Sequence, residues 1–203
     1  MLLRSIEALH QHPLITDITV VLAAEDRQFV PSVGALADEI QTVIGGDSRA
    51  QSVLNGLNAL AEKYSHNDWV VVHDAARPCL SQAGLDRLFE TGLNIDDGAI
   101  LAMPVADTLK RCGSQNEIVG TVDRQQIWAA QTPQLFRLGV LKTALESAMK
   151  QGLAITDEAS AIELAGGRPK LVEGAAGNIK ITWPGDLQIA ESILKSEKKG
   201  QSR

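Results

Sequence analysis

The chain has 203 residues, of which 44% are hydrophobic and 22% charged, and its formal net charge is -6. This length can bury one sizeable core, so we expect a single domain over residues 1–203. Aromatic residues make up 3% and no basic stripe is present, which argues against a nucleic-acid-binding protein. No apolar run approaches the roughly 20 residues that span a bilayer, and no signal-peptide pattern opens the chain. We therefore expect a cytoplasmic protein without a membrane partner.

Apolar runs alternate with amphipathic stretches, which predicts an α/β fold with a mostly parallel sheet and helices on both faces. In chain order, the first half predicts a helix over 2–10, strands over 18–23 and 40–44, a helix over 48–63, a strand over 69–73, a helix over 82–93 and a strand over 99–104. The strand over 69–73 is the clearest, because its continuous aliphatic run WVVV implies cover on both faces.

Residues 107–126 leave this pattern, because their short extended pieces have no amphipathic helix to cover them. We expect a protruding β-arm or flap here and place it at residues 105–127. The rest of the chain predicts an extended segment over 128–136, helices over 138–151 and 157–165, strands over 170–173 and 179–182, a helix over 184–195 and a solvated tail over 196–203.

Two cysteines, Cys79 and Cys112, lie far apart without CxxC spacing or a His/Cys cluster. The spacing predicts neither a disulfide framework nor a zinc site. We also find no group of carboxylates suited to a metal cage, so no residue is assigned as a metal ligand.

The motif HDAARP follows the WVVV strand, which places Asp74 and Arg77 at the carboxyl end of that strand, where α/β folds bind ligands. A turn with an Asp cap and a helix-stopping proline explains the same residues without function. The segment GGDSRAQS follows the 40–44 strand and opens a helix. Its glycines allow close backbone approach, and Arg49 and Ser52 can donate to a phosphate or a base, although a capped helix after a glycine turn is the simpler explanation.

Three further segments carry candidate residues. Thr156 begins an N-cap with acids in the first turn, and Lys180 lies in NIK on a short late strand. Taken alone, these are a helix cap and a solvated edge charge. Arg124 lies in the arm, where a surface ion pair would contribute little, whereas a guanidinium can bind a phosphate through two hydrogen bonds.

Read together, the segments GGD-R--S, HDAARP, DT-K, TVDR, TPQ, ITDEAS, VEG and NIK make the chain resemble the 2-C-methyl-D-erythritol 4-phosphate cytidylyltransferases. The alanine pair in HDAARP favours this family over the ribitol phosphate cytidylyltransferases. The resemblance implies a Rossmann-like nucleotide-diphospho-sugar transferase fold. It also implies transfer of CMP from CTP to methylerythritol phosphate, with release of pyrophosphate, in non-mevalonate isoprenoid synthesis. Mg²⁺, bound mainly through the CTP phosphates, is the implied cofactor.

The same resemblance implies a role for each matching residue. Gly46, Asp47, Arg49 and Ser52 would bind the nucleotide. Asp74, a catalytic residue with Arg124 and Lys180, would lie beside the ribose, the substrate and the metal-bound phosphates. Lys180 and Arg124 would position methylerythritol phosphate for attack.

The resemblance also assigns a substrate pocket and a partner. The pocket residues would be Thr108, Arg77, Thr132 and Thr156. The arm would be exchanged across a homodimer, so Thr108 and Arg124 would serve the neighbouring site.

The family opens with a strand and a Gly-rich loop, PAAG-G-RM, followed by PKQ, and none of these is found here. By resemblance we expect one βα unit, on the order of 35 residues, to be missing, and the 203-residue chain to show negligible turnover and impaired stability. Trp183 stands where the family often has a basic residue. Two alternatives stay open: a noncatalytic binding or regulatory protein, and a CTP transferase for another polyol phosphate.

Overall fold

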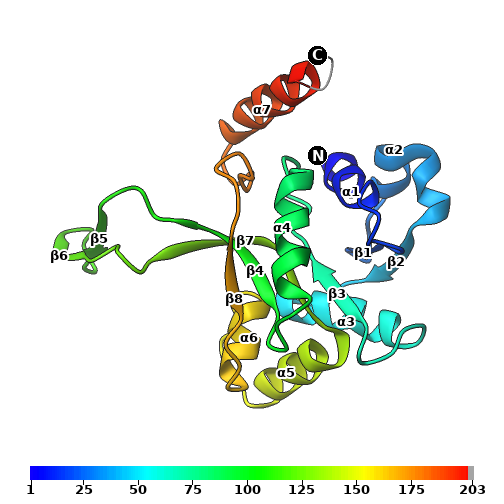
Figure 1. Cartoon of the computed structure of the whole chain (residues 1–203), viewed down its shortest axis with the longest axis horizontal. Helices are drawn as coiled ribbons and strands as arrows, with labels where there is room; N and C mark the ends of the chain where they lie inside the picture. Colours follow the sequence, from blue (N-terminus) through cyan, green and yellow to red (C-terminus); the bar gives the residue numbers. More distant parts are fainter. Residues whose placement is uncertain (201–203) are drawn as a thin grey trace.

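The structure is a computed structural model that describes residues 1–200, with side chains for residues 1–196 (Figure 1). The helices are α1 (Leu2–His10), α2 (Phe29–Val33), a 3-10 turn η1 (Gly34–Glu39), α3 (Arg49–Ala61), α4 (Gln82–Gly92), α5 (Leu138–Lys150), α6 (Glu158–Leu164) and α7 (Asp186–Gly200). The strands are β1 (Thr19–Leu22), β2 (Gln41–Ile44), β3 (Trp69–Val72), β4 (Ala99–Pro104), β5 (Leu109–Cys112), β6 (Ile118–Val122), β7 (Trp128–Arg137) and β8 (Lys170–Glu173).

The central sheet has four strands in the order β3-β7-β4-β8. Strand β4 pairs parallel with β8, whereas β7 runs antiparallel between β3 and β4. The sheet is therefore mixed, and β7 is the strand that departs from the expected parallel arrangement. The α/β class is confirmed.

Helices cover both faces of this sheet, as expected. Because side chains alternate along a strand, Ile100 and Phe136 face one side while Leu101 and Leu135 face the other. The first pair packs in a core with α3, α5 and α6, and the second packs against α4. A third core joins α1, α2 and the β1-β2 pair around Ile6.

Strands β1 and β2 form a separate parallel pair, and among the described residues β1 and β3 each have a single ladder partner. A cavity of about 580 Å³ lies between them, lined by Val20 and Val21 of β1 and by Val70 and Val71 of β3. All four residues of β1 are only half-buried. The facing edges of these two strands thus border an apolar space that reaches the ends of both strands.

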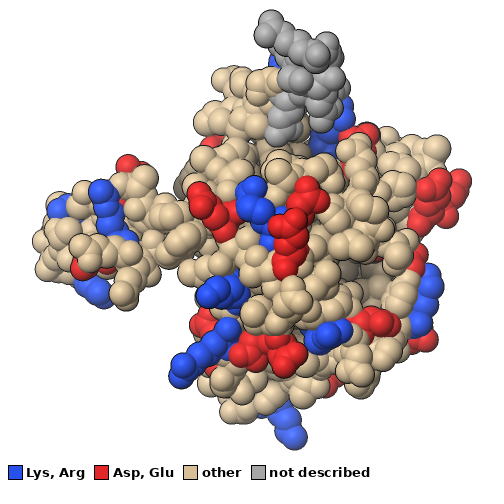
Figure 2. Space-filling view, in the orientation of Figure 1, with Lys and Arg blue, Asp and Glu red and all other residues tan. Residues whose placement is uncertain are grey.

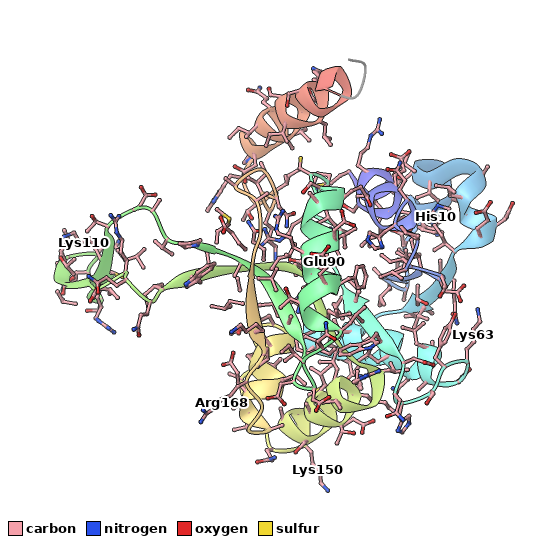
Figure 3. All side chains as sticks on the ribbon, viewed as in Figure 1. His10, Lys63, Glu90, Lys110, Lys150 and Arg168 are labelled. Carbon is pink, nitrogen blue, oxygen red and sulfur yellow. The ribbon has the colours of Figure 1, made fainter. Side chains whose placement is uncertain are left out.

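The predicted arm is confirmed as a β-hairpin that projects from the sheet (Figure 1). Strands β5 and β6 pair antiparallel, and β4 and β7 lead the chain out to them and back. Lys110 lies near the end of the arm, well away from Glu90 on α4 (Figure 3). Ile118 and Val119 of β6 are 68% and 57% exposed, so the arm presents apolar side chains to solvent.

Three differences from the sequence-based expectations have local causes. No strand forms over 179–182, because Ile181 donates its backbone N–H to the carbonyl of Ala76 in a loop and joins no ladder. The short helices over 29–39 were not predicted. They break at Gly34, whose φ is 60°, so neither is long enough to show a helical period in the sequence. Helix α7 extends to Gly200, past the expected end at 195, so the predicted solvated tail is helical up to that residue and its last residues, 201–203, lie outside the described residues.

Charged residues of both signs are mixed over the face shown in Figure 2, and no basic stripe crosses it. No helix in the described part of the chain combines the length and apolar character that crossing a membrane requires.

Candidate active site

Asp74 lies at the end of β3, at the centre of a cluster of charged side chains from four segments. Arg49 donates to its Oδ1 through Nε at 3.3 Å and Nη2 at 3.0 Å, and Lys180 donates to Oδ2 at 2.9 Å. The Asp74 side chain is 13% exposed. Burial alone would raise the pKa of Asp74, but Lys180 and Arg49 outweigh it and hold that pKa below its usual value. Asp74 is therefore ionised and fixed between two cations.

Arg49 is anchored from the other side by Glu158, the first residue of α6. The guanidinium donates to Glu158 Oε1 at 2.7 Å and Oε2 at 3.0 Å, a two-point contact with a carboxylate that is 1% exposed. Burial raises the pKa of Glu158, and the bonds from Arg49 counteract that rise. Glu158 was not assigned a role from the sequence, because nothing in ITDEAS distinguishes a buried acid from a first-turn acid that only complements the helix dipole.

The GGDS segment forms the expected turn into α3. Ser48 caps the helix by accepting from the Gln51 N–H. The Ser52 hydroxyl accepts from the Gly46 N–H at 3.1 Å and donates to the Ser48 carbonyl at 2.9 Å. A Cβ at Gly46 would lie 2.1 Å from the Gln51 side chain, so glycine is required there. Asp47 is exposed at the turn.

Arg77 and Thr132 are built into the floor beneath Asp74. Arg77 donates to the carbonyl of Asn178 at 2.7 Å, which holds the NIK segment against the loop after β3. Burial lowers the pKa of Arg77. Thr132 is 4% exposed, and its hydroxyl accepts from the Asp74 N–H at 2.9 Å. The structure thus brings Asp74, Arg77, Thr132 and Lys180 together.

Thr156 is exposed at the start of α6, next to the Asp157 capping box. Behind it lies Gln134, which is 1% exposed and was not singled out from the sequence. Gln134 donates to Asp157 Oδ2 at 2.9 Å and accepts from the Ala159 N–H at 2.9 Å. This buried amide fixes the helix that carries Glu158.

Thr108 and Arg124 do not join this cluster within one chain. Both are exposed on the arm, and Arg124 donates to the carbonyl of Ala106. The arm projects away from the sheet (Figure 1). Their assignment to a neighbouring site stays a prediction.

Three cations, Arg49, Arg77 and Lys180, surround two carboxylates, Asp74 and Glu158. The cluster therefore has a surplus positive charge that suits an anionic ligand. The β1-β3 cavity also reaches Arg49, Ser52 and Asp74. In the part of the chain that the structure describes, no three His, Cys, Asp or Glu side chains are grouped to hold a metal ion.

Comparison with known proteins gives a consistent result. Residues 1–196 match the family described as IspD: 2-C-methyl-D-erythritol 4-phosphate cytidylyltransferase. A protein of that name from Haemophilus influenzae (strain PittGG) is 49% identical over 200 residues, covering 98% of this chain and 85% of the relative. A protein of the same name from Shewanella oneidensis is 46% identical over 198 residues, covering 98% of this chain and 78% of the relative.

Solved structures agree with these relatives. The Francisella tularensis 2-C-methyl-D-erythritol 4-phosphate cytidylyltransferase superposes with a TM-score of 0.84 at 36% identity, covering 95% of this chain and 88% of that one. A 4-diphosphocytidyl-2C-methyl-D-erythritol synthase superposes with a TM-score of 0.86 at 42% identity, covering 95% and 89%. The chain belongs to the 2-C-methyl-D-erythritol 4-phosphate cytidylyltransferase family, the nucleotidyltransferases that transfer CMP from CTP to methylerythritol phosphate in isoprenoid synthesis.

Proposed function

We propose that the cluster around Asp74 is where this chain binds CTP and methylerythritol phosphate for the cytidylyl transfer of its family. The observation that carries the proposal is the fixed Asp74 carboxylate, held by Arg49 on one oxygen and by Lys180 on the other. With Arg77 beside them, three cations face two carboxylates, so part of their positive charge is not neutralised. Phosphates of two substrates can compete for them.

The reaction needs position and charge more than covalent help from the protein. A phosphate oxygen of methylerythritol phosphate attacks the α-phosphorus of CTP in line, and the bond to the pyrophosphate oxygen breaks. Lys180 is 48% exposed and can turn from Asp74 to the phosphates, where it stabilises the charge on the transferring group. Arg77 is 11% exposed and stays bonded to the Asn178 carbonyl beneath the cluster.

The nucleotide is proposed to lie over the N-terminus of α3. The turn at Gly46 leads into the helix, and the positive end of the α3 dipole favours an anion. Asp47 and Ser52 would then contact the cytidine, and Thr156 would border the methylerythritol phosphate. Arg49 keeps its position because Glu158 anchors it from below.

Mg²⁺ is proposed as the cofactor, held mainly by the CTP phosphates. Both oxygens of Asp74 are engaged by cations, so the cluster offers no carboxylate cage of its own. A phosphate-bound Mg²⁺ with most of its ligands from substrate and water fits this arrangement. When bound, the ion would neutralise charge on the triphosphate.

A homodimer through the arm is also proposed. The exposed Ile118 and Val119 give the arm an apolar surface, and Thr108 and Arg124 are exposed on the arm, outside the cluster of their own chain. If two arms are exchanged, these side chains reach the partner's site. The proposed location of the protein is the cytoplasm.

The test is pyrophosphate release from CTP, methylerythritol phosphate and Mg²⁺, measured on the 203-residue chain and on an extended form engineered to carry the family's Gly-rich loop in front of Met1. We expect turnover in the extended form and negligible turnover in the 203-residue chain. Turnover by the 203-residue chain would contradict the second expectation. No pyrophosphate release by either form would favour the noncatalytic binding protein. Activity on a different alcohol phosphate would favour a transferase for another polyol phosphate.

Variants of cluster residues and of a surface residue test whether the cluster carries the activity. Lys180→Met and Asp74→Asn should each lower kcat about 10²- to 10³-fold in the form that turns over, because each removes preorganised charge. Lys63→Met is the matched control, since Lys63 pairs with Asp17 on the surface at 2.8 Å and faces no proposed ligand. Equal losses in Lys63→Met and Lys180→Met would contradict the assignment.

A further inference from the structure

His73 is the last residue of the WVVVH run, and its ring lies between two parts of the site floor. Its Nε2 is 3.0 Å from the carbonyl oxygen of Arg77, and its Nδ1 is 3.0 Å from the hydroxyl of Thr132. The same hydroxyl accepts from the Asp74 N–H. The His73 ring therefore contacts the Arg77 end of the loop directly and is linked to the Asp74 end through the Thr132 hydroxyl.

The partners determine which ring nitrogen carries the proton. A carbonyl oxygen only accepts, so the proton must be on Nε2, which donates to Arg77. In a neutral ring Nδ1 is then an acceptor, and it takes the hydroxyl proton of Thr132. The Thr132 oxygen in turn accepts from the Asp74 amide. Every donor in this chain of bonds has one acceptor, and the direction of each bond follows from the one before.

The surroundings keep the ring neutral. Burial lowers the pKa of His73 to about 4, against weaker raising effects of the Arg77 carbonyl, the Asp74 carboxylate and Thr132, while the positive charge of Arg77 also lowers it. A ring that stayed doubly protonated would place a second donor against Thr132 and remove the acceptor for its hydroxyl. The hydrogen-bond geometry and the neutral ring therefore agree.

Thr132 is held from its other side by Asn178. The Asn178 amide donates to the Thr132 carbonyl at 2.8 Å, and Asn178 is 1% exposed. The Asn178 carbonyl accepts from Arg77. The bonds thus close a ring that runs through His73, Thr132, Asn178 and Arg77, with the Asp74 amide attached to it.

We propose that His73 is a positioning residue, which, as a single Nε2–H tautomer, orients the Thr132 hydroxyl so that it fixes the backbone of Asp74. The inference rests on the proposed function for its meaning, because Asp74 is the residue positioned, but its geometry is testable without turnover. His73 touches neither substrate in this scheme. It acts through Thr132 on one side and through the Arg77 carbonyl on the other.

The direct test needs no variant. In protein labelled with 15N-histidine, two-bond 1H–15N correlation spectra distinguish the two neutral tautomers and the charged ring. We expect His73 to show the Nε2–H tautomer alone at pH 7. The Nδ1–H tautomer, exchange between tautomers or a charged ring would overturn the inference, whatever the enzyme's activity.

A matched pair of variants tests the link to Asp74. Thr132→Val removes the hydroxyl and should lower the hydrogen-exchange protection of the Asp74 amide about tenfold, the value of one ordinary hydrogen bond. Thr132→Ser keeps the hydroxyl and should restore that protection. In the form that turns over, Thr132→Val should lower kcat while KM changes less than about twofold, and Thr132→Ser should recover kcat. Equal Asp74 protection in both variants would overturn the link.

His73→Gln and His73→Asn separate the two ends of the ring. A glutamine amide can reproduce the Nε2–H donor to the Arg77 carbonyl, and an asparagine oxygen can reproduce the Nδ1 acceptor for Thr132. We expect His73→Asn to keep the protection of the Asp74 amide and His73→Gln to lose it. The reverse order would contradict the proposed direction of the bonds. The hydrogen-exchange and tautomer measurements test the role of His73 even if the proposed function is wrong, because neither requires turnover.

Discussion

At the scale of single residues, the Arg49–Glu158 pair differs from the other ion pairs of the molecule. Lys63–Asp17 and Lys195–Glu191 are exposed pairs of the kind that contribute little to stability. Glu158 is buried, so its charge depends on Arg49. Removing one partner leaves the other without compensation, which is more costly than removing a surface pair.

We expect Arg49→Ala to lower the free energy of unfolding by about 2 kcal/mol at pH 8, less than for a fully buried pair because the Arg49 side chain is 36% exposed. The loss should shrink toward pH 5. Without Arg49 the folded-state pKa of Glu158 rises further above 4.5, so the folded state binds more protons than the unfolded state, and stability falls as pH rises through that window. Urea unfolding at pH 5 and pH 8 measures this. In the Glu158→Gln background the pH dependence should disappear, and its persistence would contradict the explanation.

His73 makes the free energy of unfolding depend on pH in the opposite direction from Glu158. Its folded pKa is about 4 against 6.5 for the unfolded chain, so the unfolded state binds more protons between these values, and stability falls as pH drops from about 6.5 to about 4. The groups that face the ring are Thr132, the Arg77 carbonyl and the charges of Asp74 and Arg77. We expect this one histidine to contribute about 3 kcal/mol to the difference in stability between pH 7 and pH 4. His73→Gln should remove that part of the slope in urea titrations, and an unchanged slope would contradict the prediction.

The sequence pointed to Asp74, Arg77 and Arg49, because each follows a strand or opens a helix at a place where α/β folds bind ligands. It pointed to Lys180 only through the resemblance of NIK to the family motif. It did not reveal Glu158, Gln134 or His73 as parts of the site. Their roles depend on burial and on partners far away in the chain, such as the contact between Arg49 and Glu158, 109 residues apart. Nothing in a local pattern carries that information.

At the scale of elements, periodicity predicted the long helices and the aliphatic strands because each of them buries an apolar face that the spacing of residues reveals. It failed over 179–182. This segment looks like a strand, but Asn178 and Ile181 each bond to the loop after β3, through Arg77 and Ala76, so the segment lies across the site. The direction of β7 also could not be predicted, because strand direction depends on the connection made by the arm.

The central sheet and the β1-β2 sheet should differ in local stability. Strands β4 and β7 are buried between helices on both faces, whereas β1 has one ladder partner among the described residues and faces the cavity. We expect the amides of β1 and β2 to exchange by local opening, at least tenfold faster than the amides of β4 and β7, whose exchange should follow global unfolding. Native-state hydrogen exchange measures both. Equal protection in the two sheets would show that they open as one unit.

At the scale of the whole molecule, the proposed homodimer puts the arm in contact with another copy. Ile118→Asp places a charge on the exposed apolar surface of β6 and should weaken the proposed homodimer at least tenfold, because it opposes burial of that surface. Val30→Asp is the matched control, since Val30 is 63% exposed on α2, away from the arm. Sedimentation velocity gives the dimer dissociation constant for both variants. A dimer equally weakened by both, or by neither, would contradict assembly through the arm.

The space between β1 and β3 has a consequence for how the protein behaves in concentrated solution. These two strands have no second ladder partner among the described residues, and valine side chains line the space between them, so they form a template onto which another extended chain can add. We therefore expect the chain to self-associate through these strands as its concentration rises. Light scattering should detect growth of β-rich assemblies with concentration. Thr19→Lys, which places a charge in this space at the start of β1, should suppress that growth.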